Sequence, residues 1–167
     1  MGTKTADPRG RIRVPPFQAF LDANRANVYR FMAVAVGPQD ADDVFQETFL
    51  AALRAYPDLR DGSRLDRWVL TIASRKALDH HRAGRRRALP VAQVPERAGV
   101  EAPPAVDLHD PLWEAVRDLP ARQRVAVVHR HVLDRSYGEI AELMECTEQT
   151  ARANVYQGTK RLRELMA

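Results

Sequence analysis

Two helix starts lie close together in the stretch Ser136-Tyr-Gly-Glu-Ile-Ala-Glu-Leu-Met-Glu-Cys-Thr-Glu-Gln-Thr-Ala-Arg-Ala-Asn154. Ser136 is followed by Glu139 in the pattern of a capping box, which marks the start of a helix. Thr147 is placed to cap a second helix after a tight turn at Glu145-Cys146. Two helices joined by so short a turn have the spacing of a helix-turn-helix unit, whose second helix enters the major groove of DNA.

The second of these helices carries polar side chains suited to DNA. Ala151 and Val155 point back towards Ile140 and Leu143, which leaves positions 149, 150, 152, 153 and 154 facing outward or to the side. Asn and Gln bond adenine edges, Arg bonds guanine or phosphate, and Thr contacts a methyl group or phosphate. The candidate DNA-binding residues here are Thr147, Gln149, Thr150, Arg152, Ala153, Asn154 and Lys160. An ordinary helical hairpin with a polar outer face is the alternative that spacing leaves open.

The rest of the chain shows helical periodicity and no alternation typical of a strand. Apolar residues recur at three- and four-residue steps, and Gly37-Pro38 and Pro57 end the first two helices. Asp40 is a candidate N-cap. The expected helices span Phe17–Val36, Asp40–Tyr56, Leu65–Arg82, Leu112–Leu119, Ala121–Leu133, Ser136–Met144 and Thr147–Leu165.

A change of composition separates two groups of helices. Residues 88–110 contain four prolines and four acids against one basic residue, which is typical of an extended linker. The sequence therefore predicts an all-α fold of two small helical domains joined by a flexible linker. The expected boundaries are a disordered arm at 1–16, a first domain at 17–87, the linker at 88–110 and a second domain at 111–167.

The composition excludes several classes of protein. A hydrophobic fraction of 45% and a charged fraction of 29% are typical of a globular chain. The longest apolar run, Phe31–Val36, is far shorter than a membrane-spanning helix, and residues 1–20 lack the apolar core of a signal peptide. Cys146 is the single cysteine, so no internal disulfide can form. We therefore expect a cytoplasmic protein without membrane insertion.

The helix that begins at Leu65 is strongly basic. Residues 64–87 hold eight basic side chains against two acids, although the whole chain carries a net charge of only +4. Such local charge, on a face that does not pack, is expected of a nucleic-acid contact, and a solvated face is the alternative. Trp68 could stack on an extruded base, but at a helical core position an aromatic ring more often packs.

The preceding helix has the opposite character. Its outer face holds Asp43, Gln46, Glu47, Leu50 and Arg54, whereas Leu53 falls in the inner apolar stripe. Acids are unsuited to phosphates, so we expect this face to bind a protein if it binds anything. A solvated face is again the alternative.

No catalytic arrangement emerges from the sequence. His129 and His131 are two positions apart on a helix and so point to different sides, and His80-His81 meet the same objection. The chain has no Gly-rich phosphate loop and no nucleophile elbow. We expect no catalytic residue, no metal, no cofactor and no enzyme activity. Cys146 is expected to pack as a small apolar side chain.

Taken together, the chain resembles the extracytoplasmic-function (ECF, group 4) sigma factors of bacterial RNA polymerase. Asp40-Ala-Asp-Asp-Val-Phe-Gln-Glu-Thr-Phe-Leu50 is similar to the family's D-A-E-D-L-V-Q-E-T-F-L helix. Residues 59–82 are similar to its F-R-G-x-S-x-F-x-x-W segment and the helix that follows. Leu119-Pro-Ala-Arg-Gln-Arg124 and Ser136–Met144 are similar to its −35-recognising domain. Three differences are Glu145 in place of the usual turn glycine, Asp61 in place of a loop glycine, and Thr150-Ala-Arg-Ala-Asn154 in place of T-V-K-S-R.

The resemblance implies sigma domain 2 in the first half and sigma domain 4 in the second. It implies polymerase contacts, made with the β′ clamp helices, at Asp43, Gln46, Glu47 and Leu50. It implies recognition of the −10 element by Arg60, Ser63, Arg64, Arg67, Arg75, Lys76 and Arg82, and of the −35 element by the helix-turn-helix residues named above. The implied partners are core RNA polymerase, including its β flap, promoter DNA and an anti-sigma factor if one exists.

The expected function is therefore promoter-specific transcription initiation as a subunit of RNA polymerase. An autonomous helix-turn-helix regulator is the main alternative, but it leaves the first domain without a role. A nucleic-acid-processing enzyme is a further alternative, and it lacks catalytic residues.

Overall fold

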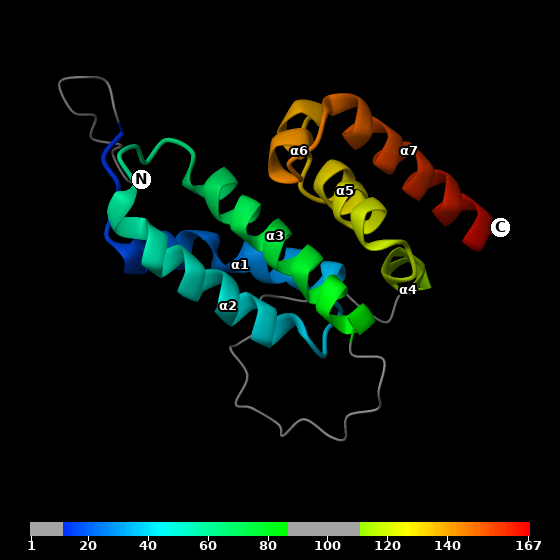
Figure 1. The fold of residues 1–167 in the computed structure, drawn as a ribbon, viewed down its shortest axis with the longest axis horizontal. Helices are drawn as coiled ribbons and strands as arrows, with labels where there is room; N and C mark the ends of the chain where they lie inside the picture. Colours follow the sequence, from blue (N-terminus) through cyan, green and yellow to red (C-terminus); the bar gives the residue numbers. More distant parts are fainter. Residues whose placement is uncertain (1–11, 87–110) are drawn as a thin grey trace.

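The computed structural model describes residues 12–86 and 111–167. These residues form helices and no β-strand, as predicted (Figure 1). The helices are α1 (Phe17–Ala35), α2 (Ala41–Ala55), the 3-10 turn η1 (Tyr56–Asp58), α3 (Leu65–Arg86), α4 (Pro111–Arg117), α5 (Ala121–His131), α6 (Tyr137–Leu143) and α7 (Glu148–Leu165). None of these helices is both long and apolar enough to cross a membrane. The linker predicted at 88–110 lies outside the described residues.

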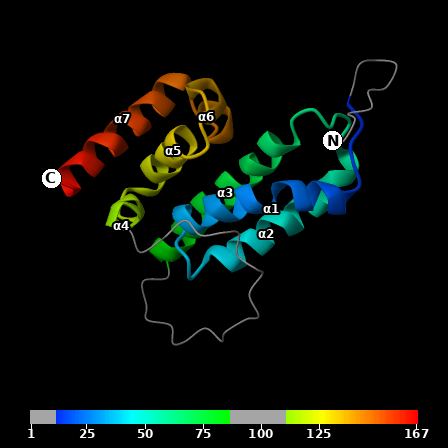
Figure 2. The same cartoon turned by 180° about the vertical axis from the view of Figure 1, so that it is seen from behind.

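Helices α1, α2 and α3 pack side by side into a first unit, residues 12–86 (Figure 2). An aromatic cluster closes one end of it: the ring of Phe20 lies 5.1 Å from that of Tyr56 and 5.7 Å from that of Trp68. Trp68 is half-buried there. The packing role predicted for this tryptophan is therefore confirmed.

Helices α4–α7 form a second unit, residues 111–167. The capping box predicted at Ser136 and Glu139 is present, and the Thr147 hydroxyl accepts a hydrogen bond from the Thr150 amide at 3.1 Å. Helix α7 crosses α5 closely, because Gly158 has no Cβ: one would lie 2.6 Å from a methyl group of Val127. The short helix α6 and the long helix α7 are thus both capped at their N-termini, and α7 also packs closely against α5.

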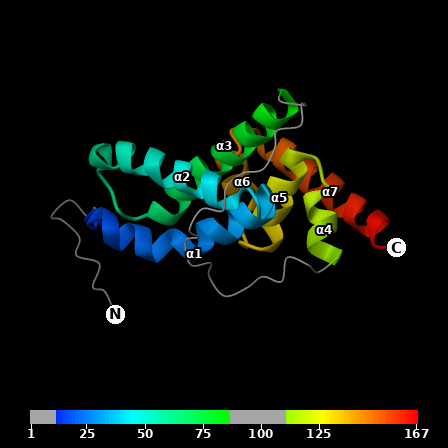
Figure 3. The ribbon, with the colours of Figure 1, turned by 90° about the horizontal axis from the view of Figure 1, so that it is seen from below.

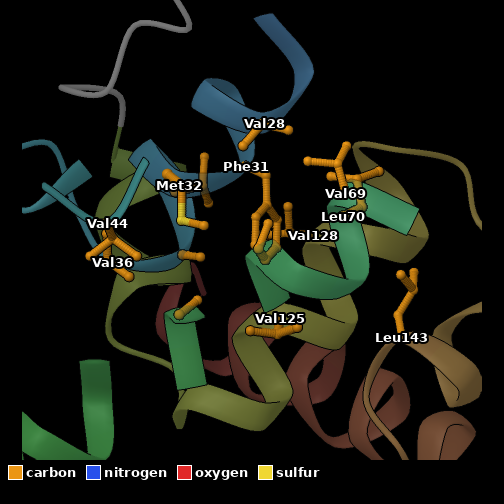
Figure 4. Packing of buried hydrophobic residues seen from close by; sticks show 14 of the residues in the cluster. Val28, Phe31, Met32, Val36, Val44, Val69, Leu70, Val125, Val128 and Leu143 are labelled. Carbon is orange, nitrogen blue, oxygen red and sulfur yellow. The ribbon is translucent and has the colours of Figure 1, made fainter. Parts of the chain in front are cut away.

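The two units pack against one another, which the sequence did not predict. Helix α1 runs beside α5 (Figure 3), and buried residues of both units form one apolar cluster (Figure 4). The ring of Phe31 on α1 lies 4.8 Å, centroid to centroid, from the ring of His129 on α5. We call the surface where α1 and α3 meet α5 and α6 the seam. Its apolar part buries residues of both units, so the described residues form one packed body.

Two local predictions are corrected by the structure. Residues 12–16, assigned to a disordered arm, are anchored: the carbonyl of Ile12 accepts from the Gly62 amide at 2.8 Å, and that of Pro15 accepts from the Tyr56 hydroxyl at 2.6 Å. Gly62 permits this approach, because a Cβ there would lie 2.6 Å from the Arg13 carbonyl. Asp40 does occupy the N-cap position of α2, but its side chain does not cap. It lies 3.1 Å from His80 Nε2 on α3 instead.

Candidate polymerase and nucleic-acid interfaces

Helix α7 presents the predicted DNA-binding residues along one outer face. Ala151, Val155 and Gly158 are buried against α5 and α6, and this rotation turns the opposite side to solvent. The exposed members are Thr147, Gln149, Thr150, Arg152, Ala153 and Lys160, with Asn154 half-buried. The structure therefore brings this predicted set together on one surface.

Two of these side chains are held by neighbours. Arg152 Nη2 lies 2.6 Å from Glu148 Oε1, and its guanidinium lies 4.4 Å from the centre of the Tyr137 ring. Asn154 Nδ2 donates to the Thr150 carbonyl at 2.9 Å. Arg152 is thus held by an ion pair within α7 and by a cation–π contact with α6 at once.

Sequence reasoning missed Tyr156. It is 71% exposed, an unusual placement for so large a ring, and lies one helical turn after Arg152 and one before Lys160. Its ring and hydroxyl thus continue the outer face of α7. The signal that could have found it is the four-residue spacing from both of these basic residues.

The predicted −10 residues are spread over a loop and one helix. Arg60, Ser63 and Arg64 are exposed before α3 begins. The Asp61 carboxylate shapes this loop by accepting from the Ser63 amide at 3.0 Å and from its hydroxyl at 2.8 Å. The aspartate that stands where the family usually has glycine therefore has a structural role. Arg82, near the end of α3, pairs with Asp79 at 3.3 Å, and Lys76 is half-buried.

Two arginines in the middle of α3 pair with acids of the second unit, but only Arg67 is largely covered, since 17% of its side chain is exposed against 53% for Arg75. Arg67 Nη2 lies 2.5 Å from Glu142 of α6, and Arg75 pairs with Glu145 just after it. In a third ion pair between the units, the acid lies on α3 and the base on the second unit: Arg135 Nη2 is 3.0 Å from Asp66 Oδ2. The expectation that this face does not pack is therefore corrected. Acids on α6 and in the turn after it attract these arginines, and no pattern in the sequence indicated that these elements meet.

Two carboxylates, those of Asp66 and Glu139, have lowered pKa values. Burial alone would raise the pKa of Asp66, but hydrogen bonds to Arg135 and to backbone amides lower it overall. The pKa of Glu139 is lowered mainly by its hydrogen bond to the Ser136 amide in the capping box. Both carboxylates are thus held in the charged form near neutral pH.

Glu145 adopts a backbone conformation that favours glycine. Its φ is 51°, in the left-handed region, where a side chain costs roughly 1 kcal/mol. The helix-turn-helix turn nevertheless places the carboxylate against Arg75. The residue that departs from the family pattern is thus one that joins the two units.

Helix α2 exposes its acidic face. Asp43, Gln46 and Glu47 are exposed, and Leu50 beside them is 53% exposed. Leu53, predicted to face inward, is 48% exposed and extends the apolar part of this face by one turn. The error arose because position 53 lies at the edge of the apolar stripe, where periodicity does not decide.

At the centre of the seam, a buried histidine joins the two units. His129 is fully buried, and its Nε2 lies 2.9 Å from Ser74 Oγ on α3. The Ser74 hydroxyl donates to the Leu70 carbonyl, so its oxygen must accept from an Nε2–H of His129. Burial, together with the nearby charge of Arg135, lowers the pKa of His129 to about 3. The imidazole is therefore neutral at physiological pH.

Side chains that could ligate a metal ion are not clustered among the described residues. Those residues contain no cluster of three His, Cys, Asp or Glu side chains able to hold a metal ion. A pocket of about 470 Å³ at the end of the seam is lined by His80, His81, Arg124 and Arg161 among others. Arg124 there donates to the Ala35 and Leu119 carbonyls, which ties α5 to the end of α1.

Comparison with known proteins finds relatives that cover both units. The family model for sigma-70 region 2 matches residues 20–87, and that for sigma-70 region 4 matches residues 109–162. The ECF RNA polymerase sigma factor SigD of Mycobacterium tuberculosis is 33% identical over 156 residues, covering 86% of this chain and 74% of SigD. SigC of the same species is 30% identical over 141 residues, covering 83% of this chain and 76% of SigC.

The chain belongs to the ECF sigma factors of the sigma-70 family. As a sigma factor, it directs promoter-specific initiation of transcription by RNA polymerase. Sigma factors as a family are not enzymes.

Solved structures share the fold of this sigma factor. The sigma factor RpoE from Bartonella quintana, solved with the anti-sigma factor NepR, has a TM-score of 0.72 at 23% identity, covering 90% of this chain and 96% of RpoE. CnrH, solved with the cytosolic domain of CnrY, has a TM-score of 0.62 at 16% identity, covering 90% of this chain and 86% of CnrH. In this sigma factor, region 2 includes most of α1 and all of α2 and α3, and region 4 includes α4 to most of α7.

Proposed function

We propose that this sigma factor uses three separate surfaces during initiation. The exposed face of α2, with Asp43, Gln46, Glu47 and Leu50, docks on the β′ clamp helices of core RNA polymerase. The loop before α3 and the basic residues of α3 contact the −10 element, and the outer face of α7 contacts the −35 element. The second unit also contacts the β flap. The protein acts in the cytoplasm and supplies recognition without catalytic chemistry of its own.

The observation that carries this assignment is the difference in charge between neighbouring helices of one unit. Helix α2 exposes two acids, a glutamine, two leucines and a single arginine in its last turn, Arg54, whereas the adjacent α3 carries a row of arginines. An acidic and partly apolar face suits a protein partner, and a basic one suits phosphates. An autonomous regulator needs neither the α2 face nor region 2.

An anti-sigma factor is a further partner that we propose. RpoE, which shares the fold, was solved with the anti-sigma factor NepR, and CnrH, which also shares it, with the cytosolic domain of CnrY. That likeness supports the existence of an inhibitor of this kind, without indicating its identity or its binding surface.

The experiment that tests the proposed function uses the purified full chain and core polymerase from the same organism. The chain should form a stable complex with core and support transcription from a subset of a promoter library. Sequencing of the transcripts then identifies conserved upstream and downstream elements. Failure to bind core, together with specific binding to an operator by the chain alone, would instead favour the autonomous regulator.

A further inference from the structure

The segment that precedes α1, Ile12–Pro16, is docked on the loop that precedes α3 (Figure 1). The Ile12 carbonyl accepts a hydrogen bond from the Gly62 amide at 2.8 Å, and the Tyr56 hydroxyl donates to the Pro15 carbonyl at 2.6 Å. We call Ile12–Pro16 the docked segment. It precedes the match to the region 2 family model, which begins inside α1, so that match gives it no role.

The docking depends on the absence of a side chain at Gly62. A Cβ there would lie 2.6 Å from the Arg13 carbonyl oxygen and 3.2 Å from that of Ile12. Both are backbone atoms, which cannot rotate away as the end of a side chain can. The φ of Gly62 lies outside the left-handed region, unlike that of Gly37. The loop therefore does not need glycine for its own conformation, and Gly62 provides space for the docked segment.

Docking changes the charge of this end of the molecule. Residues 56–64, which form η1 and the loop before α3, hold two arginines and two aspartates, so their formal charges cancel. Both arginines, Arg60 and Arg64, are exposed. Each is two residues from Gly62, and its Cα therefore lies within about 7.6 Å of the Cα of Gly62. The docked segment adds Arg13, which is also exposed, and so gives this end a net positive charge.

We propose that the docked segment belongs to the promoter interface: it packs on the loop before α3 at Gly62, and Arg13 contacts a DNA phosphate beside the −10 element. Such a contact adds affinity and holds the loop in register on the DNA, because a phosphate carries no sequence information. Guanidinium groups are well suited to it, since they donate charged hydrogen bonds to phosphate oxygens. This inference rests on the proposed role of the loop in −10 recognition.

A purely structural role is the alternative for the docked segment. The ring of Phe17, the first residue of α1, lies 5.1 Å from that of Tyr56, so this end of the first unit is packed beside the segment. In that case the docking would stabilise the fold, and the exposed Arg13 side chain would have no effect on DNA. Its contribution to promoter binding therefore decides between the two roles.

The test uses the holoenzyme, formed from the full chain and core polymerase, and a labelled duplex carrying a promoter that the library selects. Arg13→Ala removes the charge, and Arg13→Lys retains it. Arg25→Ala is the matched control, because Arg25 is an exposed arginine of α1 outside the proposed surfaces. Fluorescence anisotropy measures the Kd over a range of salt concentrations, and a titration with labelled core measures assembly.

We expect Arg13→Ala to lower the slope of log Kd against log salt by about 1, the change for one lost phosphate contact. Arg13→Lys and Arg25→Ala should retain the wild-type slope, and all three variants should bind core equally well. An unchanged slope in Arg13→Ala would overturn the proposal. A loss in Arg13→Lys as large as that in Arg13→Ala would also contradict it, because the charge would then not be what acts.

Gly62→Ala tests whether Arg13 acts through the docking. The substitution should displace the docked segment, and should therefore lower the slope by at least as much as Arg13→Ala does. Adding Arg13→Ala to Gly62→Ala should lower it no further, since residues that act as one unit give non-additive effects. Fully additive losses would show that Arg13 acts without docking on Gly62.

Arg60→Ala with Arg64→Ala distinguishes the failure of this inference from the failure of the proposed function. If this loop variant lowers the slope and Arg13→Ala does not, only the role of the docked segment falls. If neither variant lowers the slope, the proposed −10 contact of the loop falls as well. If the chain forms no holoenzyme with core, the proposed function itself falls, and this inference with it.

Discussion

At the scale of single residues, His129 links the stability of this sigma factor to pH. It is neutral in the fold with a pKa of about 3, because it is fully buried near Arg135. In the unfolded chain its pKa is about 6.5. Since the unfolded chain binds the proton more readily, the favourable contribution is complete above about pH 6.5 and is lost as the pH falls towards 3.

We therefore predict that acidification from about pH 7.5 to about pH 5 lowers the free energy of unfolding, with a slope of up to ~1.4 kcal/mol per pH unit from this group. Urea unfolding at several pH values measures it. His129→Gln should show a weaker pH dependence, even if its stability is lower throughout. His131→Gln, at an exposed position of the same helix, should retain the wild-type dependence. A parallel pH dependence in wild type and His129→Gln would contradict the assignment.

The outer face of α7 leads to a second prediction at this scale. A good bidentate base contact contributes about 1–3 kcal/mol of discrimination, so Asn154→Ala and Arg152→Ala should each change base preference at one −35 position. Lys160→Ala should weaken binding to all sequences alike, because a phosphate contact carries no sequence information. Transcription from promoters randomised upstream measures both effects. Unchanged preference in Asn154→Ala and Arg152→Ala would place base recognition elsewhere.

At the scale of elements, the crossing of α5 and α7 depends on one missing side chain. A Cβ at Gly158 would lie 2.6 Å from Val127 Cγ2 and 3.4 Å from Gln123 Cβ. Neither helix can move without disturbing the buried contacts on both sides. Gly158→Ala should therefore lower the free energy of unfolding by about 1–3 kcal/mol through overpacking.

Gly84 provides the matched control for that change. It also lies within a helix, but a Cβ there would meet nothing within 4 Å. Gly84→Ala should raise stability by roughly 0.5–1 kcal/mol, because alanine favours helix. Denaturant titration of both variants measures the difference. Similar effects at the two positions would show that the α5–α7 crossing is looser than the structure indicates.

At the scale of the whole molecule, the face of α2 should determine affinity for core polymerase. Truncation of a polar group at a buried contact costs about 1–3 kcal/mol when its partner is left unpaired. Gln46→Ala with Glu47→Ala should therefore weaken core binding and leave the circular dichroism spectrum unchanged. Gln18→Ala with Asp22→Ala, a similar pair on the exposed side of α1, is the control. Titration of labelled core measures both, and equal affinities would exclude this face as the docking surface.

The local structure of this protein follows from its sequence. The capping box at Ser136 and the cap at Thr147 set the helix-turn-helix unit, and both are interactions between residues close in the chain. Apolar periodicity predicts the helices for the same reason, because it too depends on residues close in the chain. Periodicity was wrong at the end of one helix, since α3 continues to Arg86, and at the edge of one apolar stripe, since Leu53 faces solvent. The outer faces of α2 and α7 could also be predicted, since a solvent-facing side is the complement of an apolar stripe.

What only the tertiary structure decided is how the two units meet. Apolar periodicity shows which side of a helix is buried, but it does not show which other element that side packs against. The pairs between Arg67 and Glu142 and between Ser74 and His129 join residues far apart in the chain. No local spacing encodes such contacts, because they depend on the packing of α1 and α3 against α5 and α6. The sequence alone therefore determined which surfaces this sigma factor has, and the fold determined which of them the free protein exposes.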